Sequence, residues 1–404
     1  MKKWIAGILL TLLVVAAVAW FSLDKSVRFL LLNPPANENV LFWSTAQRDA
    51  GFRSIEKINI LPLRTVLKGE APSTDSVFAL NKGDPLSIDD DYLQNYMREN
   101  RAAALIVMHK GKVVLEKYGL DFNADEKWTS FSVAKSFTST LVGAAIKDGF
   151  ITSLDDKVSD YIHDMRGSVY DDVSIEQLLT MTSGVKWNED YSDPNSDVSK
   201  FNFEQADDGV DATASYMRSL SRAAPAGSQW LYSTGETNLI GLLIVEATGK
   251  TLSEYLSEKV WSKIGAEQDA TWILGATGNE IGGCCIQATT RDYLRFGQYV
   301  LSQIKASESA ASTESIVPDG WWEKAVTTQA DIGSSTGGYG FQWWTSNDGS
   351  FEGKGIFGQG LFIDPQLDLV IALNSNWENA SGGREIAARQ AMYQRIQQAV
   401  LAAR

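Results

Sequence analysis

One apolar stretch constrains the fold of this chain more than any other. Residues 131–149 read FSVAKSFTSTLVGAAIKDG, and Gly149 is a typical helix stop. Ala134, Phe137 and Leu141 recur at the spacing of one helix face. The rest of the helix surface is also small and apolar, with Val142, Gly143, Ala144 and Ala145. Because a helix that is apolar on all sides belongs inside a protein, we predict a central helix enclosed by other elements.

The start of this helix carries a serine and a lysine three residues apart. At this spacing the side chains of Ser132 and Lys135 share a face. Free N–H groups and the helix dipole favour negative charge beside Ser132, and a neutral amine can activate a serine hydroxyl. The alternative is a capping serine and a surface lysine, which fits a buried helix poorly. A Ser–His hydrolase would have only His109 and His163 to choose from.

The first 25 residues form a separate segment. Lys2 and Lys3 precede residues 5–23, which carry no charge and are long enough to span a bilayer. Residues 17–19 (AVA) resemble a signal-peptidase site, so a cleaved signal and a secreted or periplasmic protein are the alternative. We favour an inner-membrane anchor. Lysines on its N-terminal side place the globular part in the periplasm or otherwise outside the cytoplasm.

The pattern beyond the anchor predicts an α/β (α+β) protein. Residues 26–85 are expected to be an irregular lead-in, and residues 86–404 one domain. An antiparallel sheet is built from both ends of this domain, about 86–130 and 335–404, and flanked by helices; a mostly helical subdomain, about 131–334, is inserted. The expected strands cover 103–109, 112–118, 339–345, 356–363 and 369–374, and the expected helices cover 88–100, 131–149, 174–180, 211–221, 239–256, 288–304 and 383–403.

Composition excludes some classes of function. A net charge of −14 over 404 residues argues against nucleic acid or an anionic membrane surface as a partner. The two cysteines, Cys284 and Cys285, are adjacent, and we expect them to be buried and not bridged. No metal-type spacing is present, and neither a metal nor an organic cofactor is expected.

A tyrosine could join the site around Ser132. Tyr232 lies in a loop, residues 230–235, that enters a helix, from where its phenol could shuttle a proton. Its pKa would have to be shifted by a cation such as Lys135. The alternative is a tyrosine that only packs in the core.

A glycine-rich stretch could supply the oxyanion hole. Residues 353–359 read GKGIFGQ and enter a strand, and glycines let a backbone approach a ligand closely. The N–H of Ile356 could then face the N–H of Ser132, and such a donor contributes roughly 3 kcal/mol to transition-state stabilisation. The alternative is an ordinary glycine-rich β-turn.

These motifs, in this order, resemble the serine β-lactamase and penicillin-binding-protein superfamily. The chain is most similar to the branch of 6-aminohexanoate-dimer (nylon-oligomer) hydrolase and the class C β-lactamase-like serine hydrolases. The resemblance covers about residues 40–400. It includes 178–184 (LLTMTSG), 189–191 (EDY), 267–270 (EQDA) and 291–297 (RDYLRFG).

The resemblance implies a role for each site residue. Ser132 would be acylated, Lys135 would hold or take its proton, and Tyr232 would act as general base or acid toward the leaving group. The backbone N–H groups of Ser132 and Ile356 would form the oxyanion hole. Tyr191 is similar to the tyrosine of a substrate-closing loop in the amide-hydrolysing branch.

The chain departs from the family pattern at three positions. Thr234 stands where penicillin-recognising members have the asparagine of Y-x-N, and residues 353–355 (GKG) replace K-T-G. Gln268 stands where the nylon-oligomer hydrolases carry histidine. Both Thr234 and Gln268, with Tyr191 and Gly355, are our candidates for substrate contact. Lys354 could replace the missing cation only from a different direction.

The sequence thus predicts a serine hydrolase that forms an acyl-enzyme on Ser132 and hydrolyses a small ester or amide. A β-lactamase or D,D-peptidase is the alternative within the enzymes. A non-catalytic binding or sensor module is the alternative of another class, against which the intact Ser132, Lys135 and Tyr232 count. The oligomeric state stays open.

Overall fold

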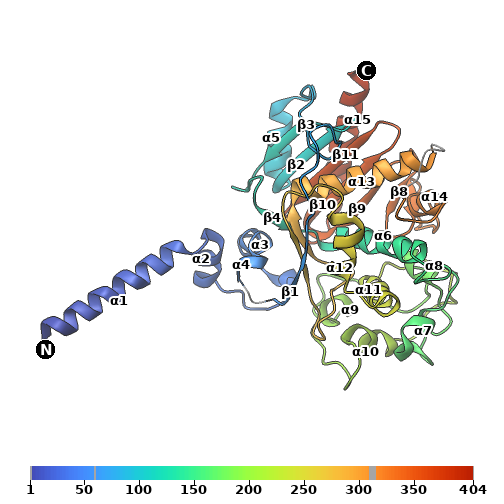
Figure 1. The fold of residues 1–404 in the computed structure, drawn as a ribbon, viewed down its shortest axis with the longest axis horizontal. Coiled ribbons are helices and arrows are strands. Elements are labelled where there is room, and N and C mark those ends of the chain that lie inside the picture. The colour runs from blue at the N-terminus through green and yellow to red at the C-terminus, as the bar shows by residue number, and fades with distance from the viewer. Residues whose placement is uncertain (1, 59–60, 309–314, 404) are drawn as a thin grey trace.

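A seven-stranded antiparallel sheet is the central element of the fold (Figure 1). The computed structural model describes residues 2–58, 61–308 and 315–403. The strand order of the sheet, β3-β2-β11-β10-β9-β8-β7, joins the two ends of the globular part where β11 pairs with β2. The predicted fold class is therefore confirmed. The strands are β2 (Ala102–His109), β3 (Lys112–Tyr118), β7 (Gly337–Tyr339), β8 (Trp344–Ser346), β9 (Phe351–Gly355), β10 (Gln359–Asp364) and β11 (Leu369–Ser375).

Helices cover both faces of this sheet. Side chains of a strand alternate between the two faces, and in β11 Ile371 joins the core under α5 (Asp90–Glu99) and α15 (Gly383–Ala402). Its neighbour Val370 faces α13 (Thr290–Glu308) on the opposite face. Because helices cover both faces of the sheet, all seven residues of β11 are buried.

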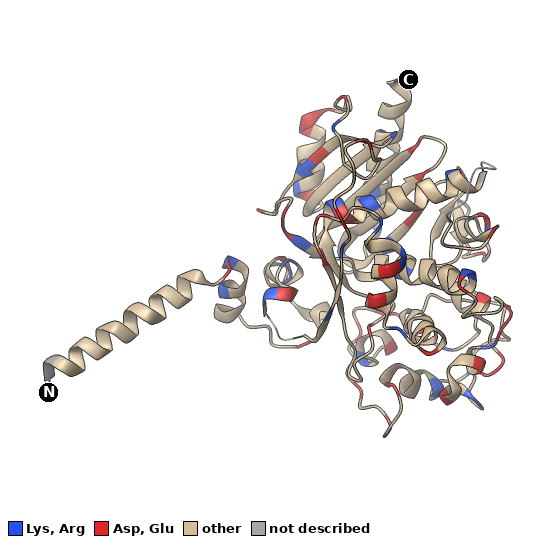
Figure 2. Cartoon of the chain, in the orientation of Figure 1, with Lys and Arg blue, Asp and Glu red and all other residues tan. Residues whose placement is uncertain are grey.

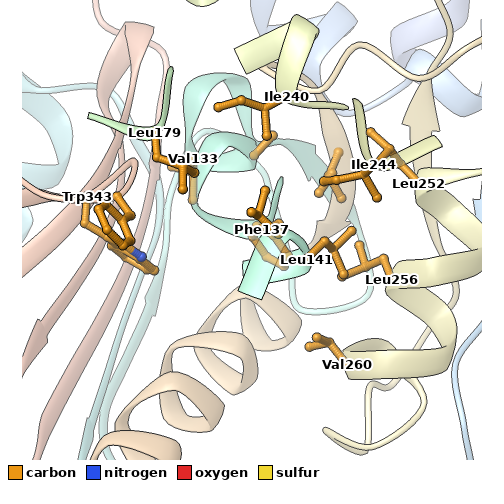
Figure 3. Close-up of a cluster of buried hydrophobic side chains, with 14 of the residues drawn as sticks. Val133, Phe137, Leu141, Leu179, Ile240, Ile244, Leu252, Leu256, Val260 and Trp343 are labelled. Carbon is orange, nitrogen blue, oxygen red and sulfur yellow. The ribbon is translucent and has the colours of Figure 1, made fainter. Parts of the chain in front are cut away.

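The central helix α6 (Ala134–Lys147) is enclosed as predicted. Twelve of its residues are buried. Figure 3 shows Phe137 and Leu141 of this helix among apolar side chains of α11 (Thr234–Thr248) and α12 (Leu252–Leu256). The helix begins later than we predicted, because a 3₁₀ turn, Phe131–Val133, precedes it. Ser132 lies in this turn and does not cap the helix.

The inserted part between the sheet halves is mostly helical. The capping box of Ser174 and Gln177 is present at α8 (Ile175–Leu179), as its sequence indicates. Gly249 ends α11 at φ 67°, a left-handed conformation that glycine adopts readily. The further helices are α7 (Val158–Tyr161), α8 (Ile175–Leu179), α9 (Asp197–Lys200), α10 (Ala212–Arg218) and α14 (Trp321–Ala325).

The lead-in is more regular than predicted. It contains α2 (Lys25–Leu32), α3 (Thr45–Phe52), α4 (Ile55–Ile58) and β1 (Leu63–Val66), and α3 starts with a complete capping box. Strand β1 belongs to a second sheet that the sequence did not reveal, in the order β1-β5-β6-β4. Its other strands are β4 (Lys127–Thr129), β5 (Ala270–Ile273) and β6 (Ile286–Thr289).

Two predicted strands are wrong because turns interrupt them. Residues 339–345 are divided between β7 and β8, with a tight turn closed by the Gly340 N–H and the Trp343 carbonyl. Residues 356–363 begin with a turn in which Phe357 has φ 58°, and β10 starts only after it.

Helix α1 (Lys2–Ser22) extends away from the globular part (Figure 1). Residues Trp4–Ser22 carry no charged residue, as the uniform colour in Figure 2 shows, and they have a mean hydropathy of 2.4 with none of the span buried. The helix is long and apolar enough to cross a membrane, and a signal peptide would pass the same test.

Candidate active site

Lys135 is the buried centre of a polar cluster. Its side chain is in the first turn of α6 and the residue is only 1% exposed. Its Nζ lies 3.1 Å from Ser132 Oγ, 3.0 Å from Thr234 Oγ1 and 2.9 Å from the Gly283 carbonyl. Burial lowers the pKa of Lys135 to about 8, although the charge of Glu189 opposes this shift. About one tenth of the amine is then neutral at pH 7 and able to accept a proton.

Ser132 is presented to this amine by a strained turn. Phe131, the residue before it, has φ 43°, which non-glycine residues rarely adopt. Its ring is held 5.0 Å from the ring of Phe52 and 5.5 Å from that of Phe357. Such strain persists only where the packing enforces it, and it concentrates at functional sites. Ser132 itself is partly exposed, unlike the buried Lys135.

Tyr232 is the third member of the cluster. Lys135 Nζ lies 5.3 Å from the centre of its ring, and the ring stacks on Trp344 at 5.5 Å. Burial and the charge of Glu189 raise the pKa of the Tyr232 phenol well above its usual range, against a hydrogen-bonding interaction with Ser132. The downward shift of the Tyr232 pKa that a role as proton acceptor would require is therefore not found. A neutral phenol suits Tyr232 to donating a proton, which leaves the amine as the base.

The glycine-rich stretch runs along the turn that bears Ser132. A Cβ added to Gly355 would lie 2.6 Å from the Ser130 carbonyl, so this close approach of two backbones needs glycine. Strand β9 ends at Gly355, and Ile356 opens the following turn. The structure thus brings the backbone of Ile356 to the neighbourhood of Ser132, in the turn between the end of β9 and the start of β10.

Glu189 connects Tyr191 and Thr234 to each other. Its carboxylate was not among the site residues that we predicted from the sequence. Its carboxylate accepts hydrogen bonds from Tyr191 Oη at 2.8 Å and the Thr234 N–H at 3.0 Å, and also from Thr234 Oγ1 and Trp187 Nε1. Tyr191 and Thr234 therefore belong to the polar cluster. The EDY motif was visible in the sequence, but Glu189 looked like one acidic residue among many in a polar loop.

The loop that carries Gly283 is fixed from several sides. The Gly283 N–H donates to Asn238 Oδ1 at 2.9 Å, and a Cβ on Gly283 would lie 3.1 Å from Lys135 Nζ. Our expectation for the next two residues is wrong, because Cys284 and Cys285 form a disulfide. The turn folds back here, with the Cys284 carbonyl accepting from Trp272 Nε1 at 2.8 Å, and adjacency in sequence gave no sign of that turn.

Gln268 lies away from the Ser132 cluster. It donates from Nε2 to the Asp125 carbonyl at 2.8 Å and lines a different cavity, beside Glu56. Lys354 lies at the edge of the cluster: it pairs with Glu352 at 3.0 Å, and its Nζ is 4.7 Å from the centre of the Trp344 ring that stacks on Tyr232. Among the residues that the structure describes, no three His, Cys, Asp or Glu side chains are grouped to hold a metal ion.

The fold and this cluster define a hydrolase of the β-lactamase fold. Residues 90–394 match the family described as Beta-lactamase, and the chain belongs to this family.

Among relatives, it is 31% identical over 300 residues to the 6-aminohexanoate-dimer hydrolase of Paenarthrobacter ureafaciens, covering 70% of this chain and 75% of that protein. A solved structure from Bacillus anthracis, named after the same hydrolase, is 25% identical with a TM-score of 0.72 and covers 90% of this chain and 97% of that one. A class C β-lactamase is similar in fold alone, at 18% identity and a TM-score of 0.56, over 78% of this chain and 94% of that one.

Proposed function

We propose that the protein is a serine hydrolase that forms an acyl-enzyme on Ser132 and hydrolyses a small linear amide or ester. The observation that carries the proposal is the contact between Ser132 Oγ and the buried amine of Lys135, whose pKa is lowered to about 8. A neutral amine at hydrogen-bond distance is what a serine needs in order to become a nucleophile at neutral pH.

Acylation follows from the positions of these groups. Ser132 Oγ attacks the substrate carbonyl carbon, and Lys135 Nζ accepts the serine proton as the Oγ–C bond forms. The developing negative oxygen is stabilised by the N–H groups of Ser132 and Ile356. The phenol of Tyr232 donates its proton to the leaving nitrogen or oxygen, the bond to the leaving group breaks, and the Lys135 ammonium returns a proton to Tyr232.

Deacylation reverses these roles with water. Neutral Lys135, directly or through Tyr232, takes a proton from water, and the hydroxide formed attacks the acyl carbon. The bond from carbon to Ser132 Oγ breaks, the serine oxygen takes the proton back, and the carboxylic acid product leaves.

The substrate of one relative favours a linear amide. Tyr191 and Gly355 are our remaining candidates for substrate contact, beside the stacked rings of Tyr232 and Trp344. The similarity to a hydrolase of the 6-aminohexanoate dimer supports an amide between small linear units. Hydrolysis of β-lactams is the second candidate, which the family match supports. Lys354 is engaged by Glu352, which weakens the case for gripping a β-lactam carboxylate.

The N-terminal helix supports a location at a membrane. We propose that α1 anchors the protein in the inner membrane with the hydrolase domain outside the cytoplasm, since lysines precede the apolar span. A secreted or periplasmic form after cleavage is the alternative, and the size of the mature protein in membrane and soluble fractions distinguishes the two.

The function is tested with the full chain against a chromogenic β-lactam, a short-chain aryl ester and a linear dipeptide-like amide, beside Ser132→Ala. Turnover of the ester or amide that is lost in Ser132→Ala supports the proposal. Preferred turnover of the β-lactam would favour the second candidate. No turnover, together with no adduct on Ser132 after treatment with a fluorophosphonate at pH 8, would overturn both and favour a non-catalytic binding module.

A further inference from the structure

We infer that Glu189 is a positioning residue that sets the direction of the hydrogen bonds from Thr234 to Lys135, so that the lone pair of the neutral amine points at Ser132. This inference rests on the proposed function. It concerns a residue of the polar loop before α9 that makes no contact with Ser132 in the hydrogen bonds described above.

The carboxylate of Glu189 can only accept hydrogen bonds. Its two oxygens face four donors, namely Tyr191 Oη, Trp187 Nε1, and both the N–H and the Oγ1 of Thr234. The loop is thereby joined to the first residue of α11. A carboxylate held by four hydrogen bonds has a fixed orientation. Because it can only accept, each partner has to direct a proton at it.

Thr234 transmits this requirement. Its hydroxyl has one proton, and the carboxylate beside it can only be the acceptor of that proton. The oxygen of Thr234 must then present a lone pair to Lys135 Nζ, 3.0 Å away, and accept from it. An asparagine at this position would offer both a donor and an acceptor, and so would not need the glutamate.

The contacts of Lys135 leave one direction for its lone pair. A neutral amine has two N–H donors and one lone pair. The Gly283 carbonyl, 2.9 Å away, accepts one hydrogen, and Thr234 Oγ1 accepts the other. The remaining contact, to Ser132 Oγ at 3.1 Å, is left for the lone pair. The amine is therefore oriented as the base for Ser132 before substrate arrives.

Glu189 helps to orient the neutral amine of Lys135, but its negative charge reduces the fraction of the amine that is neutral. It favours the protonated form of Lys135, against the burial that disfavours it. The other titratable groups facing this pair are Tyr191, Tyr232 and Tyr339, and burial raises the pKa of each phenol far enough to keep it neutral. Removing the charge should thus make more neutral lysine but orient it less well.

The two effects of Glu189, on the orientation and on the neutral fraction of Lys135, can be measured separately. The rate of Ser132 modification by a fluorophosphonate, in which the Oγ–P bond forms and fluoride leaves, is measured from pH 5.5 to 9.5 for the full chain and its variants. For Glu189→Gln we expect the plateau rate to fall at least tenfold while the midpoint of the acid limb moves to lower pH. An amide can donate to Thr234 Oγ1 and so turn the threonine proton toward the amine.

Matched variants separate orientation from general damage. Asp190→Asn removes the same charge one residue along, where the exposed carboxylate is hydrogen-bonded by Ser192 and the Asp193 backbone of its own loop, and should leave rate and midpoint unchanged. Thr234→Ser keeps the hydroxyl and should retain the wild-type rate within threefold, whereas Thr234→Val should lose at least tenfold. Thermal unfolding of each variant reports whether it is folded.

The outcomes are distinct. If the wild-type chain is not modified at Ser132, the proposed function fails. If it is modified but folded Glu189→Gln keeps the wild-type rate, or loses rate with no shift of the midpoint, the inference about Glu189 is overturned and the proposed function stands. Equal rates for Thr234→Val and Thr234→Ser would also overturn it.

Discussion

Lowering the pH should inactivate the enzyme through Lys135 alone. With the pKa of Lys135 lowered to about 8 by burial, the neutral fraction of the amine is about one half at pH 8, one tenth at pH 7 and one hundredth at pH 6. If only the neutral amine is the base, kcat/KM for a small aryl ester should fall about fifty-fold between pH 8 and pH 6.

The assay is the initial rate of ester hydrolysis, with circular dichroism at each pH to verify that the protein stays folded. Tyr232→Phe is the control, because the pKa of the phenol is raised above this range and cannot produce the limb. Lys135→Met should lose several orders of magnitude in kcat/KM and the limb with it. A change of less than threefold between pH 6 and 8 in the wild-type chain, or a limb that survives in Lys135→Met, would refute the reasoning.

Three other changes have defined outcomes. Ser132→Ala should abolish turnover and leave the melting temperature within about 2 °C, because the side chain is partly exposed; residual turnover above 1% would contradict its role. Tyr232→Phe should reduce kcat at least tenfold more for an amide than for an aryl ester, since only the amine leaving group needs a proton; equal losses would exclude this role. Glu236 is buried, which raises its pKa to about 8, so the folded state binds more protons than the unfolded state between about pH 4.5 and 8. The free energy of unfolding should therefore fall as pH rises through this window, and Glu236→Gln should flatten that slope in urea titrations; an unchanged slope would contradict it.

The sequence predicted what depends on local pattern. The enclosed helix could be predicted because its surface is apolar on every side, and strands β2 and β3 because two short runs rich in apolar residues, 103–109 and 112–118, are separated by only two residues. The fold class followed, since both chain ends carry strands. The individual site assignments at Ser132, Lys135 and Ile356 remain predictions that activity measurements have to test.

What the sequence did not predict depends on contacts across the chain. Glu189 meets Thr234 although 45 residues separate them, and no periodicity reports such a contact. The direction of the pKa shift of Tyr232 depends on burial and on Glu189, neither of which is visible in a loop sequence. The disulfide of Cys284 and Cys285 joins two neighbours in the sequence, and no sequence pattern predicts such a bond. Strand β1 was hidden because four residues carry too little pattern.

The pairing of β11 with β2 has a consequence for folding during synthesis of the chain. Ser132 leaves the ribosome early, but the segment bearing Ile356 and the strand that closes the sheet emerge near the end of synthesis. Pairings this distant in sequence form late in folding. Until these C-terminal strands are made, the chain holds Ser132 and Lys135 without the backbone of Gly355 and Ile356 beside them. The complete arrangement of these residues then exists only once nearly the entire chain has been synthesised.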